Sequence, residues 1–395
     1  MKIEEMISKN RSNCCGCEAC ANICPKNAIS MVRDAEGFSY PKINQEKCIK
    51  CGRCDKVCPS LNAREVFPAE IPPILVAIHP DEKVRRHSSS GGAFTALSEK
   101  ILNDGGIIFG AGFDENWHVK HMAAENFDEL ENLRGSKYVQ SEIGDIYKRV
   151  KAELETGRKV LFSGVPCQCA GLKNFLGKDY ENLLTVGIMC YGVPSPLLWE
   201  SYIEWLGRGH EISRVNFRSK RFGWSPLHLE ITFKDCGYYI KRDMQDFYFQ
   251  EFLLNLILRP SCGNCKFRFP NLNCDIILGD AWGVQNFAPD FFDNRGTSVI
   301  VVNTNTGVKF CNNLQLKAKA VDMNALMPQS LFFVPTPEDE RRKSFFDDLA
   351  KTKLPINVLQ KYFLQNPAQV STVNGKKLNE SFSARIKEIN KRYSK

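Results

Sequence analysis

Two runs of closely spaced cysteines near the start of the chain could bind metal through their thiolates, which are ligands for zinc and for iron–sulfur clusters. Both runs have the spacing Cys-x2-Cys-x2-Cys-x3-Cys-Pro, so the second run is a repeat of the first. The cysteines of the first run are Cys14, Cys17, Cys20 and Cys24, and those of the second are Cys48, Cys51, Cys54 and Cys58.

This spacing is that of the bacterial two-cluster ferredoxins, in which three thiolates bind one [4Fe–4S] cluster and the cysteine before proline crosses to the other cluster. Zinc needs only four ligands at a site and gives no reason for the repeated third cysteine or for the Cys-Pro pair. We therefore predict two [4Fe–4S] clusters, with Cys15 left over as a spare thiol. The predicted ligand sets are Cys14, Cys17 and Cys20 with Cys58, and Cys48, Cys51 and Cys54 with Cys24.

Four cysteines further along the chain form a second candidate metal site. Two of them follow predicted strands, and the other two form a Cys-x2-Cys loop. The set could ligate a third [4Fe–4S] cluster or a structural zinc ion, and Cys169 and Cys274 are alternative members of it. The four cysteines are Cys167, Cys190, Cys262 and Cys265.

Three other segments carry residues that suit an anionic or planar ligand. Segment 87–97, HSSSGGAFTAL, places serines and two glycines before a predicted helix, whose free N–H groups could seat a phosphate. An ordinary serine N-cap explains it equally well. Segment 133–141, LRGSKYVQS, could contact a flavin or be a surface turn. Segment 217–225, FRSKRFGWS, could hold an anionic ring, although a solvated basic loop is the default expectation.

The elements that position these residues alternate between strand-like and helix-like segments from about residue 73. We predict an α+β fold class, with a bacterial-type ferredoxin domain at 1–62, a larger mixed α/β domain at 73–345 and a helical extension at 346–395. A β-hairpin is predicted between the cysteine runs, at 28–43. Strands are predicted at 74–79, 105–113, 159–164 and 183–190, and helices at 94–104 and 146–157.

Composition narrows the class of protein. The chain has 395 residues, 17 cysteines and a net charge of +8. It contains no run of 18 apolar residues and begins with an acidic, non-hydrophobic segment, so we expect no membrane span and no secretory signal. A cytoplasmic location follows, where so many cysteines indicate metal ligands rather than disulfides. We find no nucleic-acid-binding signature, and no Rossmann or Walker motif.

Seven motifs in one order resemble the family of coenzyme F-420 hydrogenase/dehydrogenase beta subunits. They extend over roughly residues 70–335, and the ferredoxin half in front of them is a common arrangement among relatives. The motifs are HSSSGGAF, GSKYVQS, LFSGVPCQCAGL, CYGVPSP, FRSKRFGW, RPSCGNCKF and DIILGDAWG.

The resemblance implies an iron–sulfur flavoprotein whose larger domain binds FAD. It favours a third [4Fe–4S] cluster on Cys167, Cys190, Cys262 and Cys265, and it implies that FAD exchanges a hydride with coenzyme F-420 or another small molecule. The residues that it implies as flavin contacts are Ser89, Ser90, Gly91, Gly92, Ser136, Lys137 and Tyr138.

We therefore expect an oxidoreductase that moves electrons between a small-molecule redox substrate and its clusters, with a ferredoxin or a partner redox protein as the other reactant. The rival hypothesis is a non-catalytic protein that relays electrons between a partner dehydrogenase and an acceptor. At the end of the chain, residues 375–395 predict an amphipathic basic helix that packs on its own domain or docks on a partner or an anionic membrane. Its apolar residues are Leu378, Phe382, Ile386, Ile389 and Tyr393.

Overall fold

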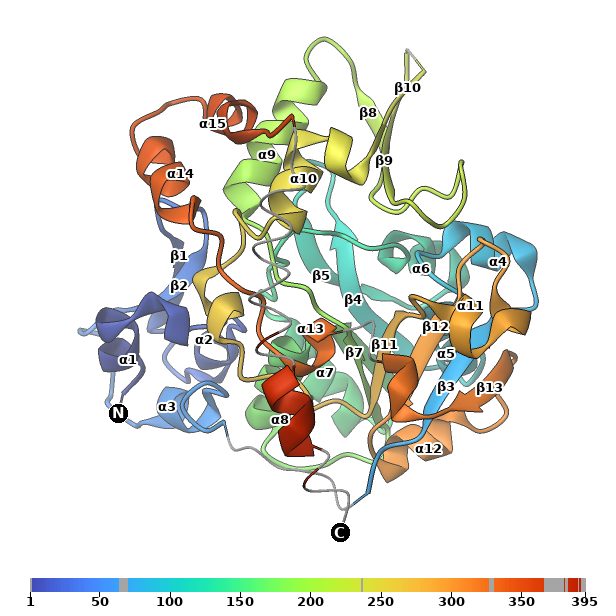
Figure 1. Cartoon of the computed structure of the whole chain (residues 1–395). Helices are drawn as coiled ribbons and strands as arrows, with labels where there is room; N and C mark the ends of the chain where they lie inside the picture. Colours follow the sequence, from blue (N-terminus) through green and yellow to red (C-terminus); the bar gives the residue numbers. More distant parts are fainter. Residues whose placement is uncertain are drawn as a thin grey trace.

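The computed structural model describes residues 2–63, 70–235, 237–326, 330–365, 380, 383–389 and 391. The N-terminal domain, drawn in dark blue in Figure 1, lies at one side of a larger domain built around a long mixed sheet. Among the described residues, no helix has the length and apolar character needed to span a bilayer.

The two cysteine runs have matching local structure. Each leads into a five-residue helix, α2 (Ala19–Ile23) in the first run and α3 (Arg53–Val57) in the second. The residue before each helix has a left-handed backbone, Glu18 with φ 60° and Gly52 with φ 69°. The repeat in the sequence is therefore also a repeat of backbone conformation.

A hairpin lies between these two helices, as predicted. Strands β1 (Ile29–Arg33) and β2 (Ser39–Ile43) pair antiparallel. The carboxylate of Asp34 accepts hydrogen bonds from the backbone N–H groups of Glu36 and Phe38, both at 3.0 Å, and so closes the turn. The first helix of the domain, α1 (Ile3–Lys9), packs beside the first cysteine run.

The larger domain is built on an eight-stranded sheet with the order β13-β3-β12-β11-β7-β6-β4-β5. Its four central strands are parallel to one another, and the outer pairings are antiparallel. The central strands are β4 (Ile107–Phe113), β6 (Val160–Gly164), β7 (Leu183–Ile188) and β11 (Ile276–Asp280). The outer strands are β3 (Ile74–Ile78), β5 (Val119–Ala124), β12 (Ser298–Val302) and β13 (Lys317–Val321).

Helices cover both faces of this sheet. Ile107 and Phe109 of β4 point into a core shared with α7 (Ile146–Glu155) and α8 (Pro166–Leu176). Ile108, between them, points to the opposite face, where α5 (Ala93–Asn103) and α6 (Phe127–Leu133) pack. The alternation along a strand therefore builds a three-layer α/β/α arrangement, and the mixed α/β prediction is confirmed. Shorter helices around the sheet are α4 (Glu82–His87), α11 (Val284–Phe287), α12 (Asn305–Cys311) and α13 (Ser330–Phe333).

A third core joins the upper part of the molecule in Figure 1 to the N-terminal hairpin. It contains a three-stranded antiparallel sheet and four helices, together with Phe38 and Tyr40 of the N-terminal domain. The strands are β8 (Ile212–Asn216), β9 (His228–Phe233) and β10 (Tyr238–Arg242), and the helices are α9 (Pro196–Leu206), α10 (Phe247–Leu253), α14 (Arg342–Leu349) and α15 (Pro355–Tyr362).

The C-terminal segments pack back onto this body. Helix α14 spans the domain boundary predicted at residue 345, and α15 packs against α9 and α10. Residues 383–389 are helical, and Ile389 is buried in the core that contains α8. Leu378, Phe382 and Tyr393 of the predicted amphipathic helix lie outside the described residues.

The N-terminal domain is held against the larger one by polar contacts and by close packing. The carboxylate of Glu18 accepts hydrogen bonds from the N–H groups of Ile143 and Gly144, at 3.1 and 3.0 Å. A Cβ atom on Gly171 of α8 would lie 2.9 Å from the Cβ of Cys17, so only glycine allows this approach. The first cysteine run is therefore placed directly on α8.

Candidate functional site

The first predicted cluster site is a hollow within the N-terminal domain. All four of its predicted ligands line the hollow, which has an empty volume of about 350 Å³. Burial raises the pKa of the Cys20 thiol, and it raises that of Cys58 to about 12. A buried thiolate is stable only with a positive partner, and iron supplies one. The four lining ligands are Cys14, Cys17, Cys20 and Cys58.

The second predicted set lies nearer the surface. Backbone hydrogen bonds bring its parts together, because Asn44 N–H donates to Ala28 C=O and Cys48 N–H donates to Asn44 C=O. The N–H of Ala28 also donates to the Sγ of Cys24, at 3.3 Å. Cys51 is exposed, whereas Cys24, Cys48 and Cys54 are half-buried.

The third set lies where the larger domain meets the N-terminal domain. Cys167 and Cys190 follow the carboxyl ends of the neighbouring parallel strands β6 and β7. Together with Cys262 and Cys265 they line a hollow that has an empty volume of about 560 Å³. Burial raises the pKa of Cys190 to about 12 and that of Cys262 to about 11. Four thiols around one hollow suit a cubane cluster.

Cys15 is the residue that sequence reasoning left without a role. It lines both the first and the third hollow, and so does Ser60. The Sγ of Cys15 lies 3.7 Å from the Oγ of Ser60. The two alternative ligands, Cys169 and Cys274, are fully buried and line neither hollow. Among the described residues, no three histidine, cysteine or acidic side chains gather on one point as a single metal ion requires.

The predicted flavin residues lie in two loops that touch each other. The Oγ of Ser89 accepts hydrogen bonds from the backbone N–H and the Oγ–H of Ser136, at 2.7 and 2.9 Å. Ser90 and Gly91 instead bind the loop to the start of β12. The hydroxyl of Ser90 donates to Thr297 C=O at 2.8 Å, and the N–H of Gly91 donates to the Oγ of Ser298 at 2.9 Å.

Glycine is required at position 91, because a Cβ there would lie 2.3 Å from the carbonyl oxygen of Ala77. Gly92, with φ 95°, is the residue from which α5 begins. The loop is thus fixed at the carboxyl end of β3 by the strands on which it packs. In open α/β sheets this end of the strands is where ligands bind.

Lys137 and Tyr138 follow Ser136 in the second loop. The ammonium group of Lys137 donates to the carbonyl oxygens of Asn132 and Arg134, at 3.0 and 2.8 Å, and burial lowers its pKa to about 7. The ring of Tyr138 stacks on Phe252 with centroids 4.8 Å apart. Lys137 thus caps carbonyl groups of its own segment, and the ring of Tyr138 packs in an aromatic cluster.

The basic loop at 217–225 is only partly solvated as expected, since Arg221, Phe222 and Ser225 are exposed. Arg218 and Trp224 are buried, 5% and 4% exposed. Arg218 forms a two-bond ion pair with Asp280 at the end of β11, at 2.7 and 3.2 Å, and also donates to the hydroxyl of Tyr138 at 3.2 Å. Trp224 stacks on Trp282 with centroids 4.6 Å apart and an interplanar angle of 5°. The sequence pointed to this loop, but the burial of Arg218 and Trp224 depends on their contacts with Asp280 of β11.

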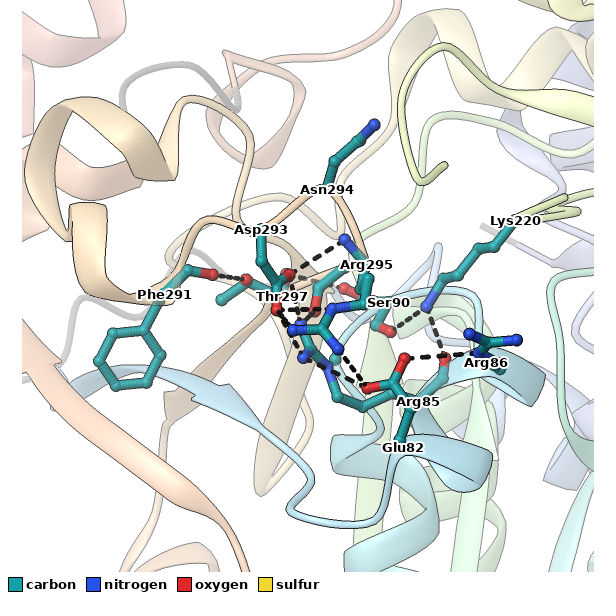
Figure 2. A network of polar contacts seen from close by, with 12 residues as sticks. Glu82, Arg85, Arg86, Ser90, Lys220, Phe291, Asp293, Asn294, Arg295 and Thr297 are labelled. Carbon is teal, nitrogen blue, oxygen red and sulfur yellow. Dashed lines mark hydrogen bonds and ion pairs between the residues drawn. The ribbon is translucent and has the colours of Figure 1, made fainter. Parts of the chain in front are cut away.

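Lys220 of the same loop reaches the serine-glycine loop, as Figure 2 shows. Its ammonium group donates to the carbonyl oxygens of Arg85 and Ser90, both at 2.6 Å. Burial, with the nearby charge of Arg218, lowers its pKa to about 7. Arg85 in turn is held by the carboxylate of Asp293 through two hydrogen bonds of 2.8 Å. The Lys220 side chain therefore ties the basic loop to the carbonyl groups on either side of the serine run.

The cysteine sets indicate an iron–sulfur protein, and comparisons with known proteins specify its family. The family model for the C terminus of the coenzyme F420 hydrogenase/dehydrogenase beta subunit matches residues 157–327, and the model for the N terminus of the same protein matches residues 74–148. Two models of a 4Fe-4S dicluster domain match residues 13–62 and 40–102. The chain belongs to the family of coenzyme F420 hydrogenase/dehydrogenase beta subunits, which confirms the resemblance.

Two relatives place this family among oxidoreductases. The F subunit of the F(420)H(2) dehydrogenase of Methanosarcina mazei is 25% identical over 208 residues, which cover 48% of this chain and 56% of the relative. The coenzyme F420-dependent sulfite reductase of Methanocaldococcus jannaschii is 24% identical over 329 residues, which cover 80% of this chain and 48% of the relative. The chain thus spans about half the length of these relatives.

A solved structure of the F420-reducing [NiFe] hydrogenase complex from Methanosarcina barkeri gives a TM-score of 0.42 at 18% identity. The match covers 75% of this chain and 94% of that chain. Similarity at this level does not define the fold.

Proposed function

We propose that this chain is an iron–sulfur flavoprotein that moves electrons between a hydride-carrying small molecule at FAD and three [4Fe–4S] clusters. The observation that carries the proposal is the contact between the first and third hollows. Each is lined by four predicted ligand thiols, and Cys15 and Ser60 lie between them. A third cluster at this place would give electrons a short route from the larger domain into the N-terminal domain.

The order of carriers follows from the positions of the cysteine sets. The third set lies where the two domains meet, the first set lines a neighbouring hollow within the N-terminal domain, and the second set lies nearer the surface. A hydride carries two electrons, whereas a cubane cluster takes one at a time. A flavin accepts the pair and releases single electrons, which is the chemistry that FAD would supply here.

The proposed flavin site is the edge formed by the ends of β3 and β11. Ser89, Ser136 and Tyr138 have hydroxyl groups at this edge that would contact the ligand, and the ammonium group of Lys220 lies against the carbonyl oxygen of Ser90 behind the loop. Asp280 neutralises Arg218, so that pair would fix the loop rather than attract the ligand. In this proposal, these hydroxyl groups and Lys220 are the groups that would hold the flavin.

Coenzyme F-420 is the substrate that the names of the relatives favour, since one is a dehydrogenase of its reduced form and the other depends on it. A separate redox protein would take or supply the single electrons. The prediction of a cytoplasmic location remains part of the proposal.

An anaerobic titration of the reconstituted protein with reduced coenzyme F-420, monitored at the flavin absorbance band, tests this function. Prompt bleaching of the flavin followed by cluster reduction would support it. If dithionite bleached the flavin and reduced coenzyme F-420 did not, the substrate assignment would be wrong. Absence of a flavin band after reconstitution with FAD would favour the relay hypothesis.

A further inference from the structure

The two cysteine runs differ in charge although they match in spacing and in backbone conformation. In the second run, three positions are occupied by Lys50, Arg53 and Lys56. The equivalent positions of the first run hold Gly16, Ala19 and Asn22, none of which is charged. Because the first run carries the same cysteine pattern without these cations, ligand spacing alone does not require them.

Basic residues stand next to the predicted ligands of the second cluster along the chain. Lys26 is two residues after Cys24, and Lys47, Lys50 and Arg53 directly precede Cys48, Cys51 and Cys54. All four of these basic side chains are exposed, as is Lys56. None of the five forms an ion pair with another described residue.

Three acidic residues lie near this set, against five basic ones, and two of the three accept hydrogen bonds from neutral donors. The carboxylate of Asp55 accepts the backbone N–H of Ile3 at 2.9 Å, and Glu4 accepts a hydrogen bond from Gln45 at 2.6 Å. Glu46 is exposed. The set therefore lies at a surface with an excess of positive charge.

An exposed apolar side chain stands among these basic residues in the sequence. Ile49, between Cys48 and Lys50, is 57% exposed, and Cys51 is also exposed. In the first run the equivalent of Ile49 is Cys15, which faces the larger domain at the third hollow. The corresponding face of the second run therefore has no such cover among the described residues.

We propose that this basic face, formed by Lys26, Lys47, Lys50, Arg53 and Lys56 around Ile49, docks a small acidic one-electron carrier protein. The proposal rests on the proposed function, because it assigns the second cluster as the exit and entry point for single electrons. Exposed cations attract a negatively charged partner over long range and orient it, and a neighbouring exposed apolar side chain offers it a contact. Solubility alone does not require a cation beside each ligand cysteine of this set.

The test measures electron transfer between the full-length reconstituted chain and an acidic two-[4Fe–4S] ferredoxin by stopped flow, at several salt concentrations. The variant is K47Q/K50Q/R53Q. The matched control is K241Q/K309Q/K319Q, which removes the same charge from exposed lysines of the larger domain. We expect the second-order rate constant at low salt to fall about tenfold or more in the variant and to lose most of its salt dependence. The control should behave as the parent chain.

Electron transfer to the small dye methyl viologen and iron analysis separate the alternatives. If the dye also fails to exchange electrons with the parent chain, the proposed function fails. If the dye works but the acidic ferredoxin exchanges no electrons, or the variant and control lose rate equally, the docking proposal is overturned. A parallel loss of dye rate and ferredoxin rate in the variant, with iron content retained, would also overturn it, because the charges would then act on the cluster rather than on the partner.

Discussion

Replacing Arg259 with glutamine should make the reduction potential of the neighbouring cluster more negative. Arg259 is only 1% exposed and comes from the larger domain, yet its guanidinium lies against the first cysteine run. It donates to the carbonyl oxygen of Cys14 at 2.9 Å, and one of its nitrogens lies 3.8 Å from the Sγ of the same residue. No carboxylate of the described residues pairs with it, so its charge acts on the cluster.

The distance gives the expected size of the change. Two unit charges about 4 Å apart interact by about 4 kcal/mol at an effective dielectric constant of ~20. For a one-electron couple about 1.4 kcal/mol corresponds to ~59 mV, so the ceiling is about 170 mV. The added electron is spread over the cluster and so lies further away on average, which reduces the shift. At about twice the separation the interaction halves, and we expect roughly 80–170 mV.

An EPR-monitored potentiometric titration of the reconstituted protein measures this shift. Arg259→Lys keeps the charge and should shift the potential less than Arg259→Gln does. Arg85→Gln is the matched control, because Arg85 is also buried but is paired with Asp293 away from the clusters. Iron analysis must first show that each variant retains its clusters.

Two results would refute this reasoning. One is an Arg259→Gln variant whose potentials all equal those of the Arg85→Gln control. The other is a shift of equal size in Arg259→Lys, which would mean that hydrogen-bond geometry rather than charge sets the potential.

Three further predictions concern the other sites. Cys167→Ser should lower the iron content by about four atoms per chain, whereas Cys15→Ser should retain the full iron content. Iron and sulfide analysis measures both, and equal losses in the two variants would make Cys15 a ligand. Asp280→Ala leaves the buried charge of Arg218 unpaired and should lower the free energy of unfolding by about 3–5 kcal/mol in chemical denaturation; an unchanged midpoint would contradict this. The pKa of Lys220 is lowered to about 7 by burial, so the unfolded chain binds more protons than the folded one above that pH. Stability relative to Lys220→Met should therefore rise between about pH 7 and pH 10, and a constant difference in denaturation midpoints would exclude this.

Features that depend on neighbouring residues could be predicted from the sequence. The cysteine spacing predicted two cluster sites. The residue before the short helix of each run has a left-handed backbone, so this conformation repeats together with the spacing. The hairpin at 28–43 and the strands at 74–79 and 159–164 were predictable, because short runs with Val and Ile bounded by turn residues favour strands. The seven ordered motifs indicated the family.

Contacts between distant residues could not be predicted in this way, because they depend on how the whole chain folds. Arg259 lies against Cys14, although the two are far apart in the sequence. Cys15 lines two hollows because the first run packs onto α8, and Arg218 of the basic loop is buried because it pairs with Asp280 at the end of β11. These contacts depend on strand order, which brings the carboxyl ends of β3, β6, β7 and β11 to one edge of the sheet. Local sequence specifies each strand, but the order of the strands is set by burial of all their faces at once, which no single segment encodes.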